Sequence, residues 1–133
     1  MWIVKIGGSW INNPNLSNLI KNLQRLSNKD NIIIVNGGGF FSDSVRLVYE
    51  NKRMSEKTGN YIALKATELF SHLLKEIDKN ICLVDDIESL RFSNKMLKIW
   101  LPSMILKNDS TFTKNWESTS DSVAAWLHSK INS

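Results

Sequence analysis

Residues 31–39, which read NIIIVNGGG, decide the fold of this 133-residue chain. The apolar run from Asn31 to Val35 predicts a strand that is buried on both faces, as is typical of parallel sheets covered by helices. The run stops at Asn36 and the three glycines that follow it. We therefore expect a turn at the carboxyl end of a parallel strand, where open α/β sheets bind their ligands.

Three other short apolar runs predict the remaining strands, and they cover residues 2–6 (WIVKI), 81–84 (ICLV) and 97–101 (LKIWL). A helix is predicted between the first two strands, with Asn13 as its cap and Pro14 at its first position. Further helices are predicted over residues 41–51, starting near Ser42, and over residues 56–78 and 118–131. The polar stretch 107–115 predicts a surface loop.

The long helix over residues 56–78 carries apolar residues at helical spacing. Ile62, Leu69, Leu73 and Ile77 predict a buried stripe along it. The order of all elements predicts a three-layer α/β/α sandwich with a mainly parallel sheet and right-handed crossovers. The length fits one domain over residues 1–133. A last helix of this kind usually delivers the chain to another strand, so we expect an incomplete sheet that lacks its C-terminal part.

The composition excludes several classes of protein. Hydrophobic residues make up 42% and charged residues 23% of the chain, as in ordinary globular proteins. The net charge of +4 comes without a long basic run, so we expect no nucleic-acid partner. No segment approaches the ~18 apolar residues of a membrane span. The single cysteine, Cys82, and the lack of an export signal predict a cytoplasmic protein. His72 and His128 have no metal-ligand spacing, so no resident metal is predicted.

The first glycine cluster follows the first strand. Gly7 and Gly8 stand between Lys5, inside the strand, and Ser9. Bare glycine backbone lets N–H groups approach an anion closely, and the Lys5 ammonium could lie beside the same phosphate. The alternative is a tight turn with Lys5 reaching out from an edge strand. A lysine inside an apolar strand is, however, costly to bury unless it meets a negative partner.

The second cluster, Gly37, Gly38 and Gly39, precedes a predicted helix start, which suits an anion or carboxylate. Arg46 in that helix could reach an anionic substrate or lie at the surface. Ser42 stands where a dinucleotide fingerprint has its third glycine, so a Rossmann-type oxidoreductase is disfavoured. A turn without a ligand is the other interpretation of these glycines.

A third element, STSDSVAAW at residues 118–126, opens the last predicted helix. Ser118 and Asp121 have the spacing of a capping box, and an acidic residue there favours the helix dipole. In the functional alternative, Asp121 faces the ligand cleft and orients a lysine or a metal.

Taken together, residues 4–9 (VKIGGS), 34–46 and 119–126 resemble the amino-acid kinase family, which includes acetylglutamate, aspartate, uridylate and isopentenyl-phosphate kinases. Residues 59–74 and 100–103 look most like a small branch related to the archaeal kinase of methanofuran biosynthesis. That enzyme phosphorylates an aminomethylfuran methyl phosphate. The resemblance covers essentially the whole chain and corresponds to the N-terminal, acceptor-binding half of such a kinase.

The resemblance implies a phosphotransferase that uses ATP and Mg²⁺, and it assigns roles by position. Lys5 would contact the transferred phosphoryl group, and Asp121 would organise the catalytic lysines. The nucleotide phosphates would bind at Gly7, Gly8 and Ser9. The small-molecule acceptor would bind at Gly37, Gly38, Gly39 and Arg46.

The sequence departs from the family after the helix that holds Asp121. Such kinases continue with another strand, a nucleotide-binding segment and a second catalytic lysine, which this sequence does not contain. The resemblance therefore implies a fragment, a split enzyme completed by a C-terminal chain, or a degenerate copy, and a homodimer is a further possibility. The alternative function is a non-catalytic binding or regulatory module that lacks its own nucleotide site.

Overall fold

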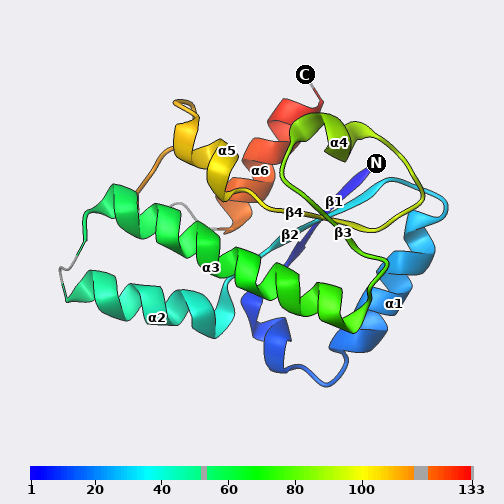
Figure 1. The fold of residues 1–133 in the computed structure, drawn as a ribbon, viewed down its shortest axis with the longest axis horizontal. Helices are drawn as coiled ribbons and strands as arrows, with labels where there is room; N and C mark the ends of the chain where they lie inside the picture. The colour runs from blue at the N-terminus through cyan, green and yellow to red at the C-terminus, as the bar shows by residue number, and fades with distance from the viewer. Residues whose placement is uncertain (52–53, 116–119, 133) are drawn as a thin grey trace.

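The structure, a computed structural model, describes residues 1–51, 54–115 and 120–132. Its centre is a four-stranded sheet in the order β1-β2-β4-β3, in which every pair is parallel (Figure 1). The strands are β1 (Trp2–Ile6), β2 (Ile32–Asn36), β3 (Cys82–Val84) and β4 (Lys98–Trp100). Because Ile6 pairs opposite Asn36 at the end of both strands, the loops that follow β1 and β2 leave the sheet at the same edge.

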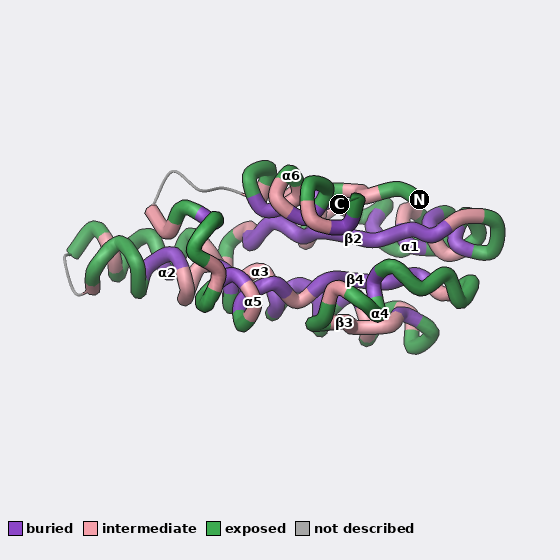
Figure 2. Tube along the Cα trace, turned by 90° about the horizontal axis from the view of Figure 1, so that it is seen from above, coloured by how far each residue is buried: buried purple, intermediate pink, exposed green. Residues whose placement is uncertain are grey.

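Helices cover both faces of the sheet, because successive residues of β2 point to opposite sides. Ile32 and Ile34 pack with α1 (Leu16–Ser27) and α3 (Glu56–Ile77). Ile33 and Val35 pack with the opposite layer, which consists of α4 (Ile87–Arg91), α5 (Ser103–Asn108) and α6 (Ser120–Ile131). β2 is buried along its whole length, as Figure 2 shows. The predicted three-layer α/β/α sandwich with a parallel sheet is confirmed.

The long helix α3 does more than cover the sheet. It also packs along α2 (Gly39–Glu50), and the two helices project together beyond the sheet (Figures 1 and 2). The predicted buried stripe on α3 is wrong: Leu69 is 52% exposed, whereas Phe70 and Leu74 are fully buried. Neighbouring residues lie about 100° apart around a helix, so two apolar stripes run side by side. Spacing alone does not tell which stripe faces the sheet.

The starts of two helices also differ from the prediction. α1 begins at Leu16 and not at Pro14, because the Asn13 side chain accepts a hydrogen bond from the Asn15 N–H (2.8 Å) and closes a turn ahead of the helix. α2 begins at Gly39, three residues before Ser42. The first turn of α2 therefore contains the last glycine of the second cluster.

Two short elements were not predicted, a 3₁₀-helix η1 (Gly8–Asn12) and the helix α5. The stretch predicted as a surface loop begins inside α5, and its Phe112 is buried in the core. The last helix is described from Ser120, so its predicted start at Ser118 lies outside the described residues.

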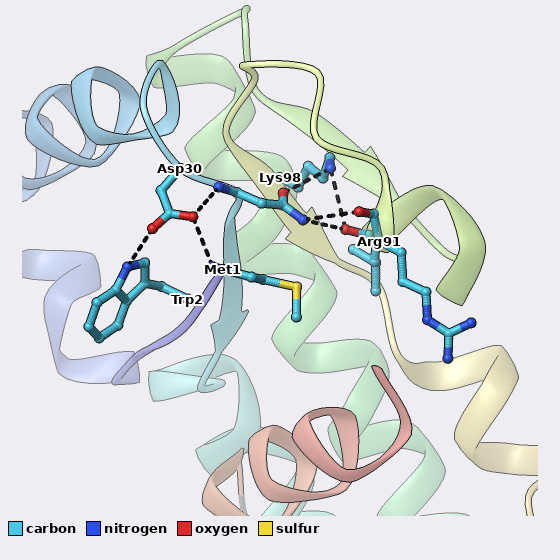
Figure 3. Close-up of polar contacts among 7 residues, drawn as sticks. Met1, Trp2, Asp30, Arg91 and Lys98 are labelled. Carbon is cyan, nitrogen blue, oxygen red and sulfur yellow. Dashed lines mark hydrogen bonds and ion pairs between the residues drawn. The ribbon is translucent and has the colours of Figure 1, made fainter. Parts of the chain in front are cut away.

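The amino ends of the strands meet in a network of polar contacts (Figure 3). The Met1 ammonium and the Trp2 indole N–H each contact the Asp30 carboxylate at 2.8 Å. The Asn31 N–H donates to the same carboxylate at 2.9 Å. Hydrogen bonding from the N-terminal ammonium, supported by the Asn31 backbone, holds the pKa of Asp30 below its ordinary value.

Lys98 lies at the centre of this network, where β4 begins. It is 1% exposed, and its ammonium donates to Asn31 Oδ1 (3.0 Å) and to the carbonyl oxygens of Leu90 and Phe92 at the end of α4. Asn31 in turn donates to the Leu90 carbonyl oxygen at 2.9 Å. Burial lowers the pKa of Lys98. The ammonium thus caps the C-terminus of α4, where a positive charge is favoured.

None of the helices in the described ranges is both long enough and apolar enough to cross a bilayer.

Candidate functional site

Lys5 and Asp121 lie together at the carboxyl edge of the sheet. Lys5 is the fourth residue of β1, Asp121 lies in the first turn of α6, and Lys5 Nζ is 3.3 Å from Asp121 Oδ1. The two side chains are 36% and 79% exposed, so water screens the ion pair and it adds little to stability. The strand lysine therefore has a negative partner, while both groups stay open to solvent.

The two glycine clusters pack directly against each other. The Gly37 N–H donates to the Ile6 carbonyl oxygen (2.8 Å), which extends the pairing of β1 and β2. A Cβ on Gly8 would lie 2.0 Å from the Gly39 nitrogen, and a Cβ on Gly37 would lie 2.8 Å from the Gly8 nitrogen. Gly39 also has a φ of +54°, which favours glycine. These three glycines are needed for contact between the loops, whatever ligand binds there.

Gly7 differs from the other glycines because it has free space around it. A Cβ there would be 3.9 Å from its nearest neighbours, Lys5 Nζ and Ser9 Oγ. The Trp10 N–H donates to the Gly7 carbonyl oxygen (3.1 Å) and starts η1, so the amides ahead of Trp10 have no partner within that turn. Gly7 thus lies close to the Lys5 ammonium.

A cleft of about 190 Å³ opens between α2, α3 and the start of α6. Two of the residues predicted to bind the acceptor, Gly38 and Arg46, line it, whereas Gly37 and Gly39 instead face the Gly8 loop. The other described lining residues are mostly small or polar: Asn36, Ser42, Asn60, Ala63, Leu64, Thr67, Asn115, Ser120 and Val123.

Asn36 ends β2 in the wall of this cleft. The Ser71 hydroxyl donates its one proton to the Thr67 carbonyl oxygen (3.3 Å), so it accepts from Asn36 Nδ2, which lies 2.9 Å away. This fixes the side-chain amide, and Asn36 Oδ1 is left buried with no partner in the part of the chain that is described. Because an unpaired buried oxygen is costly, the cleft wall favours a ligand N–H or O–H that can reach it.

Asn36 and Asn60 are cleft residues that the sequence interpretation did not assign. Asn60 is 4% exposed, and it donates to the Asn115 carbonyl oxygen (3.2 Å), which ties α3 to the segment ahead of α6. A signal for Asn36 existed in the sequence: it is a polar residue at the end of a wholly apolar strand, and such a group is buried only at a cost. Asn60 carries no comparable signal, because an asparagine in a helix usually faces solvent.

The described residues do not build a resident metal site: no three His, Cys, Asp or Glu side chains among them gather as metal ligands would. His72 and His128 are exposed. Asp86 caps α4 instead, where its carboxylate accepts from the Ser89 N–H (2.7 Å), and this hydrogen bond lowers the pKa of Asp86.

The chain is similar to two known kinases. No protein-family model matches the chain. The chain is 32% identical over 130 residues to the "[5-(aminomethyl)furan-3-yl]methyl phosphate kinase" of Methanocaldococcus jannaschii, a match that covers 96% of the chain and 59% of the relative. Among solved structures, uridylate kinase from Archaeoglobus fulgidus matches 100% of the chain and 60% of its own length, with a TM-score of 0.70 and 21% identity.

The predicted resemblance to the amino-acid kinase family is confirmed. The uridylate kinase match supports the fold, and the furan-phosphate kinase match agrees with the branch expected from residues 59–74 and 100–103. This amino-acid-kinase-like chain spans 59% and 60% of the lengths of these two proteins.

Proposed function

We propose that this chain is the acceptor-binding domain, residues 1–133, of an ATP-dependent small-molecule kinase. The observation that carries the proposal is that Lys5, Asp121 and both glycine loops gather at one edge of the sheet, with Lys5 Nζ 3.3 Å from Asp121 and close to Gly7. Phosphoryl transfer asks the protein for positioning and for neutralisation of charge more than for covalent chemistry. An ammonium beside a glycine loop at the end of a strand supplies both.

On the nucleotide side, Mg-ATP is the co-substrate of the proposed reaction. The Lys5 ammonium neutralises charge on the phosphoryl group as it is transferred. Asp121 holds that ammonium in place, and the amides of Gly7, Gly8 and Ser9 donate to phosphate oxygens of the nucleotide. The magnesium ion enters bound to those phosphates.

On the acceptor side, the small molecule occupies the cleft at Gly38 and Arg46. Arg46 adds positive charge to this cleft, and Asn36 Oδ1 accepts a hydrogen bond from the acceptor. Gly37 and Gly39 shape the loop that forms one wall. The name of the archaeal relative, a kinase of a furan phosphate, supports an acceptor that is a phosphate ester and a role in a methanofuran-type cofactor pathway.

A complete nucleotide site requires a further polypeptide, which we propose to be a complementing C-terminal segment or chain. The chain spans 59% of its curated relative, and β1 is the outermost strand of the sheet, with β2 as its one neighbour among the described residues. A free strand edge can pair with an additional strand. α6 already packs on β1 and β2, so it covers one face of the outermost strand, β1. A homodimer is the second arrangement, and sedimentation velocity of the chain with and without the complement distinguishes the two.

Phosphotransfer from Mg-ATP, measured with the product of the complete gene, tests the proposal. We expect Lys5→Ala to lower kcat by about 100- to 1,000-fold, because one charge-stabilising donor is worth that much in a preorganised site. The matched control is Lys29→Ala, since Lys29 is exposed in the turn between α1 and β2 at the opposite edge of the sheet. Wild-type turnover by Lys5→Ala would refute the assigned role.

A non-catalytic binding or regulatory module is the second candidate function, and the partial span of the relatives favours it. Calorimetry on the chain alone tests the module, because tight binding of Mg-ATP without a partner argues against it. Phosphotransfer by the product of the complete gene argues for the kinase. Either function fits a reducing cytoplasm, where the free thiol of Cys82 would stay reduced.

A further inference from the structure

A second hollow, of about 320 Å³, lies beside the cleft. It is formed by α3, α5 and the segment 109–115, and three lysines line it: Lys57, Lys107 and Lys114. We refer to it as the lysine hollow. Asn60 and Leu64 line both the lysine hollow and the cleft, so the two spaces are neighbours along α3. No role predicted from the sequence falls on these three lysines.

The lysine hollow has an excess of positive charge. Within the described ranges, no carboxylate forms an ion pair with Lys57, Lys107 or Lys114, whereas Lys65 and Lys79 are paired. Carboxylates close in sequence have other partners: Glu56 accepts from the Tyr49 hydroxyl, and the Asp109 carboxylate accepts from the backbone N–H groups of Thr111 and Phe112. Like charges gathered in one hollow repel each other, and an anion placed among them relieves the repulsion.

Two of the three ammonium groups are held in position. Lys107 Nζ lies 4.6 Å from the centre of the Tyr61 ring, at cation–π distance. Lys114 Nζ donates to the carbonyl oxygens of Asp109 and Phe112. Tyr61 is itself fixed, because its hydroxyl contacts Met104 Sδ in α5 at 3.8 Å. The hollow is therefore prearranged by contacts between its walls, which lowers the entropy cost of ligand binding.

We propose that the lysine hollow binds a phosphate group, either as free inorganic phosphate or as the phosphate of a monoester. A phosphate monoester carries nearly two negative charges at pH 7 and three strong acceptor oxygens, which matches several ammonium donors better than a carboxylate does. The further assignment of this group to the acceptor rests on the proposed function. An acceptor that already carries a phosphate ester would place that ester in the lysine hollow and its reacting group in the cleft, past Asn60.

Calorimetry and ³¹P NMR titration of the chain, without nucleotide, test the proposal with two probes, inorganic phosphate and phenyl phosphate. We expect saturable millimolar binding, and we expect Lys57→Gln and Lys107→Gln each to raise the Kd about fivefold. The matched control is Lys29→Gln, which removes the same charge at the opposite edge of the sheet and should leave the Kd unchanged. Urea unfolding of each variant confirms that the fold is retained.

The outcomes separate this inference from the proposed function. The phosphate site would be overturned if neither probe shows saturable binding. It would also be overturned if Lys29→Gln raises the Kd as much as Lys57→Gln and Lys107→Gln do. Binding of inorganic phosphate with rejection of phenyl phosphate would overturn the assignment to an ester-bearing acceptor. Lys57 and Lys107 line the lysine hollow and not the cleft, so a raised Kd in their variants reports on the hollow, whereas loss of phosphotransfer in Lys5→Ala reports on the kinase proposal.

Discussion

The two edges of the sheet use a strand lysine in opposite ways. At the amino edge, Lys98 is 1% exposed and donates to three oxygens of the protein, which close the network. At the carboxyl edge, Lys5 is 36% exposed with one carboxylate 3.3 Å away, and Asn36 Oδ1 nearby along the sheet lacks a partner in the described ranges. Both lysines sit among apolar residues of parallel strands.

The difference teaches how to separate a lysine that serves the fold from one that serves a ligand. Buried polar groups in proteins are normally satisfied by the protein itself, and the amino edge obeys that rule. A cation that stays half exposed gains little for stability from its ion pair. Under the proposed function, Lys5 and the glycine loop beside it bind the phosphate of a ligand. The following predictions test this contrast through the free energy of unfolding.

The largest expected effect is at the amino edge. Lys98→Ala would leave Asn31 Oδ1 and the Phe92 carbonyl oxygen without this donor, and it would open a cavity. The Leu90 carbonyl oxygen would keep its hydrogen bond from Asn31. We expect it to lower the free energy of unfolding by about 3 kcal/mol in urea titrations. Lys98→Met keeps the stem in place and should cost about half as much, and Lys29→Ala is the exposed control. A loss below about 1 kcal/mol for Lys98→Ala would show that the network is not structural.

The next effect in size lies in the glycine loops. Gly8→Ala places a Cβ 2.0 Å from the Gly39 nitrogen, and the backbone must move, so we expect a loss of about 2 kcal/mol. Gly7→Ala is the matched control in the same loop, because Gly7 has φ −65° and ψ 149° and its Cβ would meet nothing within 3.9 Å. It should raise stability by about 0.5 kcal/mol, since it restricts the unfolded chain. Equal losses for the two variants would contradict the packing account.

The sequence predicts the layers better than it predicts the site. The apolar run over residues 31–35, followed by Asn36 and glycine, correctly predicts a parallel strand that is buried on both faces, because such a strand has no polar face. The choice between the Leu69 and Phe70 stripes on α3 could not be made, because helical spacing does not tell which stripe faces the sheet. The meeting of Lys5 with Asp121 joins residues 116 positions apart, so it rests on topology and not on local pattern.

The glycine clusters show the same limit from another side. Their sequence predicts a phosphate-binding loop. In the structure, Gly8, Gly37 and Gly39 are needed because a Cβ there would clash with the other loop, and this would hold in any protein whose loops pack this closely. Gly7 and Gly38 lie outside that contact, and of these two only Gly7 has free space for a Cβ. The lysine hollow was not predictable, since Lys57 is far in the chain from Lys107 and Lys114 and none of the three lies in a motif.

A smaller effect concerns acid stability at the amino edge. The pKa of Asp30 in the folded chain lies below the value of 3.8 expected without its partners, mainly because of the hydrogen bond from the Met1 ammonium. A depressed carboxyl pKa adds stability above the unfolded value and loses it as the pH falls through the folded value. Asp30→Asn should therefore flatten the loss of stability below about pH 4, measured by thermal unfolding across pH. The exposed Asp43→Asn should leave the acid limb unchanged, and a steeper limb in Asp30→Asn would contradict the sign.

The smallest expected effect on stability is at the carboxyl edge. Asp121→Asn removes the partner of Lys5, yet Asp121 is 79% exposed, and exposed pairs contribute little. We expect a change below about 0.5 kcal/mol in urea unfolding, including the loss of a favourable charge in the first turn of α6. A loss above about 1.5 kcal/mol would place the pair with the amino-edge network, as a structural contact. If Asp121→Asn leaves the free energy of unfolding nearly unchanged but strongly lowers phosphotransfer, the carboxylate serves the reaction and not the fold. Its function would then be to hold the Lys5 ammonium beside the charged ligand.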